Sequence, residues 1–156
     1  LSLAHKHVPE IKFWSKITNN PIFLPTVGPY KQGMLVHVPL SLWSLRKKIK
    51  SIDMLEIYSI HYAEETFIKI IDVSPEREND FINPQALNNT NQLHIHVLHN
   101  DAEGQAIVVA QLDNLGKGAA GQAVQTMNLL ISYHDKAIET KAIETLEVIS
   151  PLTDEN

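Results

Sequence analysis

A glycine-rich loop near the carboxyl end constrains the fold of this chain most strongly. Residues 116–121 follow the spacing G-x-G-x-x-G, and Lys117 lies inside it. The apolar run 106–110 precedes the loop, and a helical pattern over 123–130 follows it. Because glycine has no Cβ, such a loop can bring backbone N–H groups close to a phosphate, and a helix N-terminus favours anions. The sequence therefore predicts a strand, a tight loop and a helix, with a candidate nucleotide contact at the loop.

The loop does not belong to a complete dinucleotide-binding unit. That unit needs a second strand carrying an acidic residue about 20 residues after the loop. The chain has 156 residues, so 35 follow Gly121, and they have the pattern of a helix and a tail; Glu139 has the right offset but no strand pattern around it. Two interpretations remain. The glycines allow a helix to pack tightly on a sheet, which composition alone favours, or the loop contacts a nucleotide that another domain mainly binds.

Alternating residues before the loop predict a β-hairpin. Gln92–His99 alternates between apolar and polar residues, 100–104 is rich in turn formers, and Gln105–Leu112 supplies the returning strand. Because a hairpin is antiparallel, we predict an α+β fold: a mixed, largely antiparallel sheet with helices packed on one face. We expect a single domain over 1–156 that ends in a tail at about 135–156.

Periodicity and helix-breaking residues predict five further elements. In chain order they are a helix of about 9–18, a short buried strand at Ile22–Leu24, a strand at Met34–Leu40 with Pro39 at an edge or bulge, a helix of roughly 52–64 capped by Ser51, and a strand at Phe67–Val73. The buried side of the second helix is expected to hold Met54, Leu55, Ile57, Tyr58 and His61 or Tyr62. The stretch 74–80 is predicted to be a charged loop.

Composition narrows the class of protein. Hydrophobic residues make up 44% of the chain, which is ordinary for a folded domain and too high for disorder. The formal net charge of −5 argues against a nucleic-acid partner, and no apolar run approaches the roughly 20 residues of a membrane span. The first residues do not form a signal peptide and include no initiator Met, so we expect a piece of a longer protein. The chain has no cysteine, which excludes disulfides and a cysteine nucleophile within it and is compatible with the cytoplasm.

The segment His5–Glu10 is a candidate catalytic site. A histidine just ahead of a helix can act as a general acid or base near neutral pH. Pro9 is a good first residue of the helix, and Glu10 can curl back to orient His5 or contact a substrate. The alternative, which a single sequence favours, is a surface histidine near a frayed terminus.

Two other polar groups invite a functional interpretation. His94 and His96 lie on one face of the predicted strand and can share a metal, but His99 has the opposite parity and no carboxylate completes the site. An interface or a solvent-facing surface is therefore favoured. The basic run 46–50 can bind phosphate, but a solvated turn before a helix is favoured there. We predict no metal site.

Five segments together resemble one enzyme family. They are Asp113–Asn128 around the glycines, His5–Ile11 with its H-K-H-V-P-E-I sequence, Phe23–Leu35, Tyr62–Phe67 and Asn91. Over roughly residues 5–133 the chain resembles the C-terminal domain of N-acetyl-gamma-glutamyl-phosphate reductases, members of the semialdehyde dehydrogenase superfamily. This resemblance implies a fold like the C-terminal domain of glyceraldehyde-3-phosphate dehydrogenase.

The resemblance also implies a reaction. These enzymes reduce N-acetyl-glutamyl 5-phosphate to the 5-semialdehyde with NADPH, through a cysteine thioester, in arginine biosynthesis. The family's cysteine and its Rossmann domain precede the position of His5 and are absent from this chain. The fragment is therefore expected to be inactive alone, to work with the enzyme's own N-terminal domain, to form a homo-oligomer and to be cytoplasmic. NADP would be bound mainly by the missing domain.

The implied site residues fall into three groups. His5 would be the catalytic acid or base that works with the family's cysteine, and Glu10, the second catalytic residue, would contact or orient the substrate. Lys6, His7, Lys31 and Gln32 would bind substrate, and the cofactor would be contacted by Asn114, Gly116, Lys117, Gly118 and Gly121.

The chain departs from the family pattern at three positions. The family usually has histidine at Thr26 and arginine at Lys6 and Gln32. Gln32 would weaken recognition of an anionic substrate, and Lys31 can substitute for it. Two alternatives stay open: an aspartate-semialdehyde dehydrogenase domain, and a non-catalytic oligomerisation module. The repeated pentapeptide in 136–145 is interpreted as a local duplication.

Overall fold

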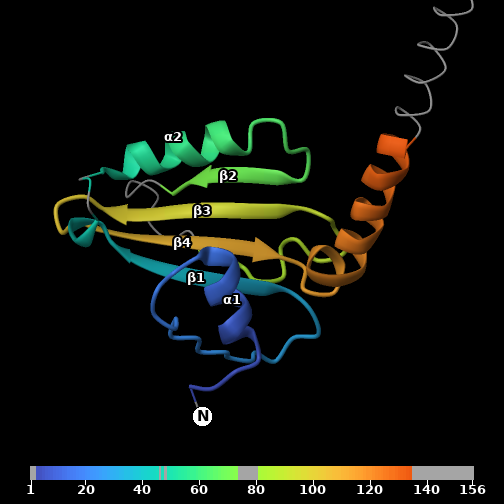
Figure 1. The fold of residues 1–156 in the computed structure, drawn as a ribbon, viewed down its shortest axis with the longest axis horizontal. Helices are drawn as coiled ribbons and strands as arrows, with labels where there is room; N and C mark the ends of the chain where they lie inside the picture. The colour runs from blue at the N-terminus through green and yellow to red at the C-terminus, as the bar shows by residue number, and fades with distance from the viewer. Residues whose placement is uncertain (1–2, 46, 48, 74–80, 135–156) are drawn as a thin grey trace, which may run out of the picture. The chain divides into compact units, whose positions relative to one another are not determined.

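Four strands build one sheet in the larger part of the chain (Figure 1). A computed structural model describes residues 3–45, 47, 49–73 and 81–134, and the chain divides into two compact units, Leu1–Tyr30 and Lys31–Asn156. The strands of the second unit are β1 (Met34–Ser41), β2 (Ile68–Asp72), β3 (Leu93–Asn100) and β4 (Gln105–Leu112).

The sheet is mixed, and its strand order is β1-β4-β3-β2. β1 and β3 both pair antiparallel with β4, whereas β2 pairs parallel with β3. α2 (Ser51–His61) packs against β2 and β3 and covers one face of the sheet (Figure 1). The predicted α+β class, with a mixed and largely antiparallel sheet, is confirmed.

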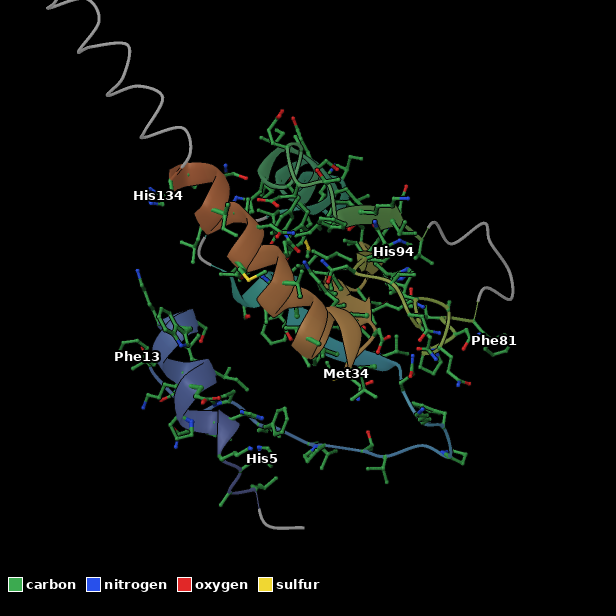
Figure 2. The ribbon with its side chains drawn as sticks, turned by 90° about the vertical axis from the view of Figure 1, so that its right-hand side faces the viewer. His5, Phe13, Met34, Phe81, His94 and His134 are labelled. Carbon is green, nitrogen blue, oxygen red and sulfur yellow. The ribbon has the colours of Figure 1, made fainter. Side chains whose placement is uncertain are left out.

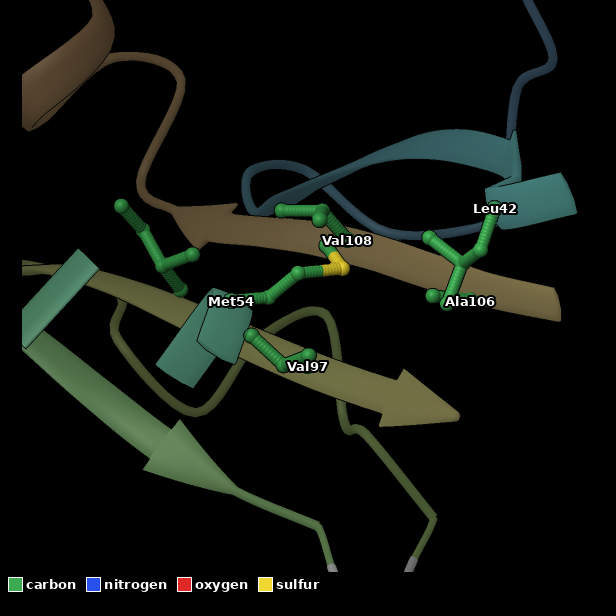
Figure 3. Packing of buried hydrophobic residues seen from close by; sticks show 6 residues of the cluster. Leu42, Met54, Val97, Ala106 and Val108 are labelled. Carbon is green, nitrogen blue, oxygen red and sulfur yellow. The ribbon is translucent and has the colours of Figure 1, made fainter. Parts of the chain in front are cut away.

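The hydrophobic core lies between α2 and the sheet (Figure 3). Ile95 and Val97 of β3 and Ala106 and Val108 of β4 share this side, because residues two apart on a strand point to the same face. Met54 of α2 packs against them. Val97 is fully buried, and burying such a side chain contributes roughly 1.5–3 kcal/mol. The apolar residues that alternate along these two strands thus form the sheet side of the core.

The hairpin forms where the sequence predicts it. Asn100 pairs with Gln105 at the end of the ladder, and its side chain accepts a hydrogen bond from the Glu103 N–H at 3.3 Å. Gly104 closes the turn with φ +60°, which glycine adopts without steric cost. Pro39 lies in the edge strand β1, as expected for a residue that cannot donate a ladder hydrogen bond.

The strand predicted at Ile22–Leu24 is wrong. This segment has no regular secondary structure, and Ile22 is 84% exposed. Pro21 and Pro25 flank it, and proline both lacks an N–H and restricts the residue before it. Three residues are at the short end of strand lengths, and the flanking prolines cannot extend the pairing.

The helix boundaries also differ from the prediction. α1 spans His7–Ser15, and Lys16 ends it with φ 57°, a left-handed conformation typical of helix ends. The N-cap of α2 is Lys50, so the predicted Ser51 cap is wrong. The Asp53 carboxylate instead accepts a hydrogen bond from the Lys50 backbone N–H at 2.8 Å.

Four of the residues predicted for the buried side of α2 pack on the core: Met54, Leu55, Tyr58 and Tyr62. Ile57 is 57% exposed, so its predicted burial is wrong. At 3.6 residues per turn, the stripe formed by positions 54, 58 and 62 leans toward 55 and leaves 57 on the other side.

The glycine loop forms a short π-helix, which the sequence did not predict. After β4, η2 (Gly116–Ala120) is a π-helix, and an α-helix continues through 121–134, with His134 at its far end (Figure 2). The predicted helix of 118–133 is therefore confirmed except for its first residues. The charged loop 74–80, Arg46, Lys48 and the tail 135–156 lie outside the described residues. None of the described helices is long and apolar enough to cross a membrane.

Candidate functional site

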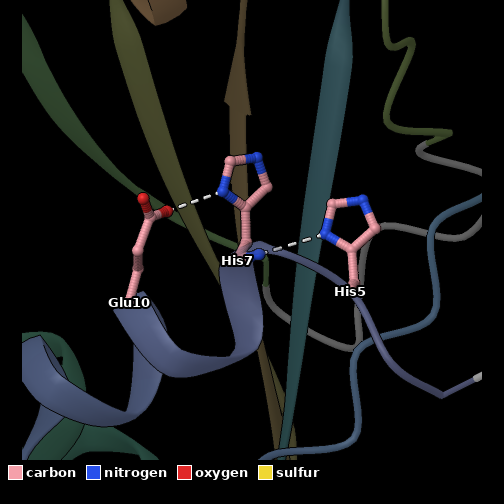
Figure 4. Close-up of polar contacts among 3 residues, drawn as sticks. All are labelled: His5, His7 and Glu10. Carbon is pink, nitrogen blue, oxygen red and sulfur yellow. Dashed lines mark hydrogen bonds and ion pairs between the residues drawn. The ribbon is translucent and has the colours of Figure 1, made fainter.

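Three side chains gather at the start of α1 in the first unit (Figure 4). The Glu10 carboxylate lies 2.7 Å from Nδ1 of His7, and both side chains are exposed, by 65% and 46%. Residues three apart on a helix share a side, so the sequence spacing alone brings this pair together. Glu10 also lies in the first turn, where the helix dipole favours a negative charge.

His5 is oriented by the helix end. Its Nδ1 accepts a hydrogen bond from the His7 backbone N–H at 3.3 Å, and its carbonyl accepts one from the Val8 N–H at 3.0 Å. Its ring centroid lies 4.7 Å from that of Phe23. Because Nδ1 is the acceptor, neutral His5 carries its proton on Nε2. The orienting partner expected for His5 was Glu10, which holds His7 instead.

Asp113 connects three loops of the second unit. It is only 2% exposed, and its Oδ2 accepts hydrogen bonds from the Asn89 N–H at 2.7 Å and from Nε2 of Gln32 at 3.1 Å. Its Oδ1 accepts the Leu115 N–H at 2.9 Å. The backbone N–H groups of Asn89 and Leu115 hold the pKa of the Asp113 carboxyl below its ordinary value. The buried charge therefore ties the segments around 32, 89 and 115 together.

Gln32 is engaged in this network rather than free. Its Nε2 also donates to Oδ1 of Asn89 at 2.9 Å, and the next residue, Gly33, donates its N–H to Oδ1 of Asn114 at 2.8 Å. A polar cavity of about 390 Å³ lies beside these groups, and its lining includes Gln32, Asn89, Thr90, Asn91, Asp113, Leu115, Gly116 and Gly121. The fold thus brings Gln32 and the glycine loop to one cavity, while Lys31, the residue before Gln32, is exposed.

Packing explains two of the three loop glycines. A Cβ on Gly121 would lie 2.5 Å from Oδ1 of Asn91, and one on Gly116 would lie 2.9 Å from the Thr90 carbonyl oxygen. A Cβ on Gly118 would meet nothing closer than 3.4 Å, an ordinary contact. Close packing therefore accounts for Gly116 and Gly121, but against the segment 90–91 that precedes β3 rather than against the sheet itself. Gly118 is the glycine for which packing gives no reason.

Lys117 of the glycine loop contacts the helix 121–134 and the segment just before β2. Its Nζ donates to Oε1 of Gln125 at 2.7 Å and sits 5.6 Å from the centre of the Phe67 ring. Burial lowers the pKa of the Lys117 ammonium, and the charge of Glu65 acts in the opposite direction. A second cavity, of about 720 Å³, opens here and is lined by Glu64, Glu65, Thr66, Phe67, Asn91, Ala120, Gly121, Val124, Gln125, Asn128, Leu129 and Ser132.

The histidine pair of β3 has partners of its own. His94 and His96 share one face with ring centroids 6.2 Å apart, and His96 Nε2 lies 2.9 Å from Oε1 of Gln111. Burial, then His96, then Lys69 lower the pKa of the His94 imidazole. Within the part of the chain that the structure describes, no three histidines or carboxylates are placed to hold a metal ion.

Comparison with known proteins identifies the family. A family model described as "Semialdehyde dehydrogenase, dimerisation domain" matches residues 1–114. The chain belongs to this family. The match ends at Asn114, so the three glycines of the loop lie just beyond it.

Relatives extend the likeness beyond that match. An N-acetyl-gamma-glutamyl-phosphate reductase of Burkholderia lata is 38% identical over 137 residues, 88% of this chain and 44% of the relative. N-acetyl-gamma-glutamyl-phosphate reductase 2 of a Nostoc species is 39% identical over 139 residues, 87% of this chain and 43% of the relative. An N-acetyl-gamma-glutamyl-phosphate reductase of a Chelativorans species is 37% identical over 134 residues, which are 85% of this chain and 43% of the relative. The chain thus spans less than half the length of these relatives, and the resemblance inferred from its motifs is confirmed.

Sequence reasoning missed several residues of this semialdehyde dehydrogenase domain. Asp113 and Asn89 form the polar network, and Gln125 receives Lys117, but the prediction assigned none of them to a site. Asp113 opens the loop motif, and a carboxylate directly after the strand pattern was the available signal. Nothing in the sequence pairs position 117 with 125, or 32 with 113.

Proposed function

We propose that this chain is the carboxyl-terminal part of an NADPH-dependent N-acetyl-gamma-glutamyl-phosphate reductase. The observation that carries the proposal is the 37–39% identity to reductases of that name over 85–88% of the chain. The substrate would be an acyl phosphate, and the acyl group would be carried on a cysteine of the amino-terminal half. A self-associating and cytoplasmic enzyme is part of the same proposal; the family description, a dimerisation domain, supports self-association.

His5 is the proposed catalytic acid or base. With Nδ1 bound to the His7 N–H, Nε2 is the nitrogen left to exchange a proton with the reacting thiol or with the oxygen that gains charge. Holding Nδ1 fixes the ring without blocking Nε2. Glu10 would act through His7, whose imidazole it contacts, and Lys6 adds a positive charge next to them.

The substrate has negative charges at both ends, so cations are the natural ligands. Lys6, His7 and Lys31 are the proposed contacts, together with Gln32. The side-chain nitrogen Nε2 of Gln32 already donates hydrogen bonds to Asn89 and Asp113. Its carbonyl oxygen Oε1 would therefore be the atom that contacts a ligand. This assignment predicts that Gln32 recognises a donor group rather than an anion.

The glycine loop fits a contact with the cofactor. Gly118 has no packing reason to lack a Cβ, which suits close approach of a ligand to its backbone. Asn114 is fixed by the Gly33 N–H at its Oδ1, so its carboxamide nitrogen is available to donate. Gly116 and Gly121 would then shape the cavity wall. NADPH, when bound, supplies the hydride that reduces the acyl group.

The test joins this chain to the amino-terminal half of the Burkholderia lata relative and follows NADPH consumption with N-acetyl-glutamyl phosphate. Turnover is expected, and replacing His5 by alanine should lower it by about 10²–10⁴-fold. The matched control is His37→Ala, because His37 is an exposed histidine on β1 of the second unit.

Three outcomes would count against the proposal. A folded joined protein without turnover would refute the reductase assignment and favour a non-catalytic oligomerisation module. Faster turnover with aspartyl phosphate would favour an aspartate-semialdehyde dehydrogenase. An unchanged rate in His5→Ala would remove His5 from the mechanism.

A further inference from the structure

The ammonium group of Lys117 contacts two other side chains of this chain. Its ammonium donates to Oε1 of Gln125 at 2.7 Å and faces the Phe67 ring at 5.6 Å. An ammonium over an aromatic face is attracted by the negative potential of the ring. Glu65 adds a favourable charge nearby. A lysine whose ammonium is held in this way has fewer donors left for a phosphate.

The positive charge of Lys117 also fixes which atom, oxygen or nitrogen, the side-chain amides of Gln125 and Asn91 present to each other. An ammonium only donates hydrogen bonds, so Gln125 must present its oxygen to it. The same oxygen accepts a hydrogen bond from Nδ2 of Asn91 at 2.8 Å. Asn91 must therefore turn its nitrogen toward Gln125, which leaves its Oδ1 buried beside Gly121. Turning either amide over would place two acceptors or two donors face to face.

These contacts hold a helix that has little other support. Along the helix 121–134, large apolar side chains are exposed, among them Val124 and Met127 at 53% each. Among the described residues, the side-chain hydrogen bonds found between this helix and the rest of its unit all use Gln125. The helix forms one wall of the 720 Å³ cavity, and Asn91 and Gly121 line both cavities.

We propose that Lys117 is a positioning residue: through Gln125 and Asn91 it sets the angle at which helix 121–134 leaves the glycine loop, rather than binding a cofactor phosphate. The relay joins η2 through Lys117, the helix through Gln125 and the start of β3 through Asn91. Its role in cofactor binding rests on the proposed function, but its role in holding the helix does not.

The first experiment measures hydrogen exchange of the helix amides in the 156-residue chain. Lys117→Met, which removes one hydrogen bond, should speed exchange over 121–134 by about three- to ten-fold, and Gln125→Met, which removes two, by about ten- to a hundred-fold. The double variant should exchange no faster than Gln125→Met alone, because that change already removes both bonds. Gln125→Glu keeps an acceptor for both partners and should exchange like the wild type. Lys47→Met, which changes an exposed lysine outside the loop and the helix, is the matched control.

Two results would overturn the relay. One is additive effects of Lys117→Met and Gln125→Met, which would mean that the two residues act independently. The other is unchanged exchange in both single variants while the control behaves as expected.

The second experiment separates positioning from phosphate binding. NADPH affinity is measured by fluorescence in the joined protein at several salt concentrations. Lys117→Met should weaken binding by about three- to ten-fold with the same salt dependence as the wild type, and Gln125→Met should behave alike. A shallower salt dependence in Lys117→Met alone would show direct contact with a phosphate and refute the positioning role. If the joined protein bound no NADPH, the proposed function would fail, and hydrogen exchange alone would decide the relay.

Discussion

Alanine substitutions at Gly118 and Gly121 test why each position is a glycine. They distinguish a glycine needed for close packing from one needed for a ligand to approach the backbone. In Gly121→Ala, the added Cβ would lie 2.5 Å from Oδ1 of Asn91 and 2.9 Å from the Gly116 carbonyl oxygen. Asn91 cannot easily move aside, because its Nδ2 is bound to Gln125. Relieving such overlaps costs about 1–3 kcal/mol. The higher helix propensity of alanine offsets about 0.5–1 kcal/mol of this cost, so we expect a net loss of stability of up to about 2.5 kcal/mol.

The same substitution at Gly118 should act in the opposite direction. Its Cβ would meet Leu112 and Asp113 at 3.4 Å, an ordinary contact, and the residue lies in the helical turn η2. Only the propensity gain remains, so Gly118→Ala should stabilise the chain by about 0.5–1 kcal/mol. In the joined protein, however, it should weaken NADPH binding, because the backbone of residue 118 is the proposed approach for the cofactor.

Urea denaturation of the two variants and the wild type, followed by circular dichroism, measures both effects on one scale. The midpoints should move in opposite directions at unchanged slope. Equal midpoints for Gly118→Ala and Gly121→Ala would refute the packing argument. A Gly118→Ala variant that binds NADPH like the wild type would remove this residue from the cofactor contact.

Further predictions concern the core and the pH dependence of stability. Val97→Ala, which removes two methyl groups from a fully buried site, should lower the free energy of unfolding by about 2–3 kcal/mol in urea titration, and a change below 1 kcal/mol would contradict the described packing. The pKa of His94 is lowered from 6.5 by burial, His96 and Lys69, so the folded state binds this proton more weakly than the unfolded chain. Stability should be complete above pH 6.5 and decline as the pH falls below it; His94→Asn should flatten that decline, and an unchanged profile would show that another group causes it.

Local sequence patterns predicted the parts of the fold that depend on neighbouring residues. The alternation in Gln92–His99 and Gln105–Leu112, with a turn between them, became β3 and β4 paired as a hairpin. The position of Pro39 in an edge strand followed from its missing N–H. The prediction failed at Ile22–Leu24, where three apolar residues were given more weight than the flanking prolines.

The candidate site was predicted only in part, for the same reason. The pair His7 and Glu10 lies three residues apart on a helix, so the sequence brought it together, although with His7 in the place expected for His5. The network of Gln32 and Asp113 joins residues 81 positions apart, and no local pattern encodes such a contact.

By itself, the sequence determined the class of fold, the hairpin and the place of the glycine loop between a strand and a helix. Each of these depends on side-chain periodicity, turn residues and backbone freedom, which act over a few residues. Only the tertiary structure decided what the loop touches: that Gly116 and Gly121 lack a Cβ to make room for Thr90 and Asn91, and that Lys117 turns toward Gln125 and Phe67. The reason is physical, because the glycine spacing permits both close packing and phosphate binding, and only the neighbours that folding supplies distinguish them.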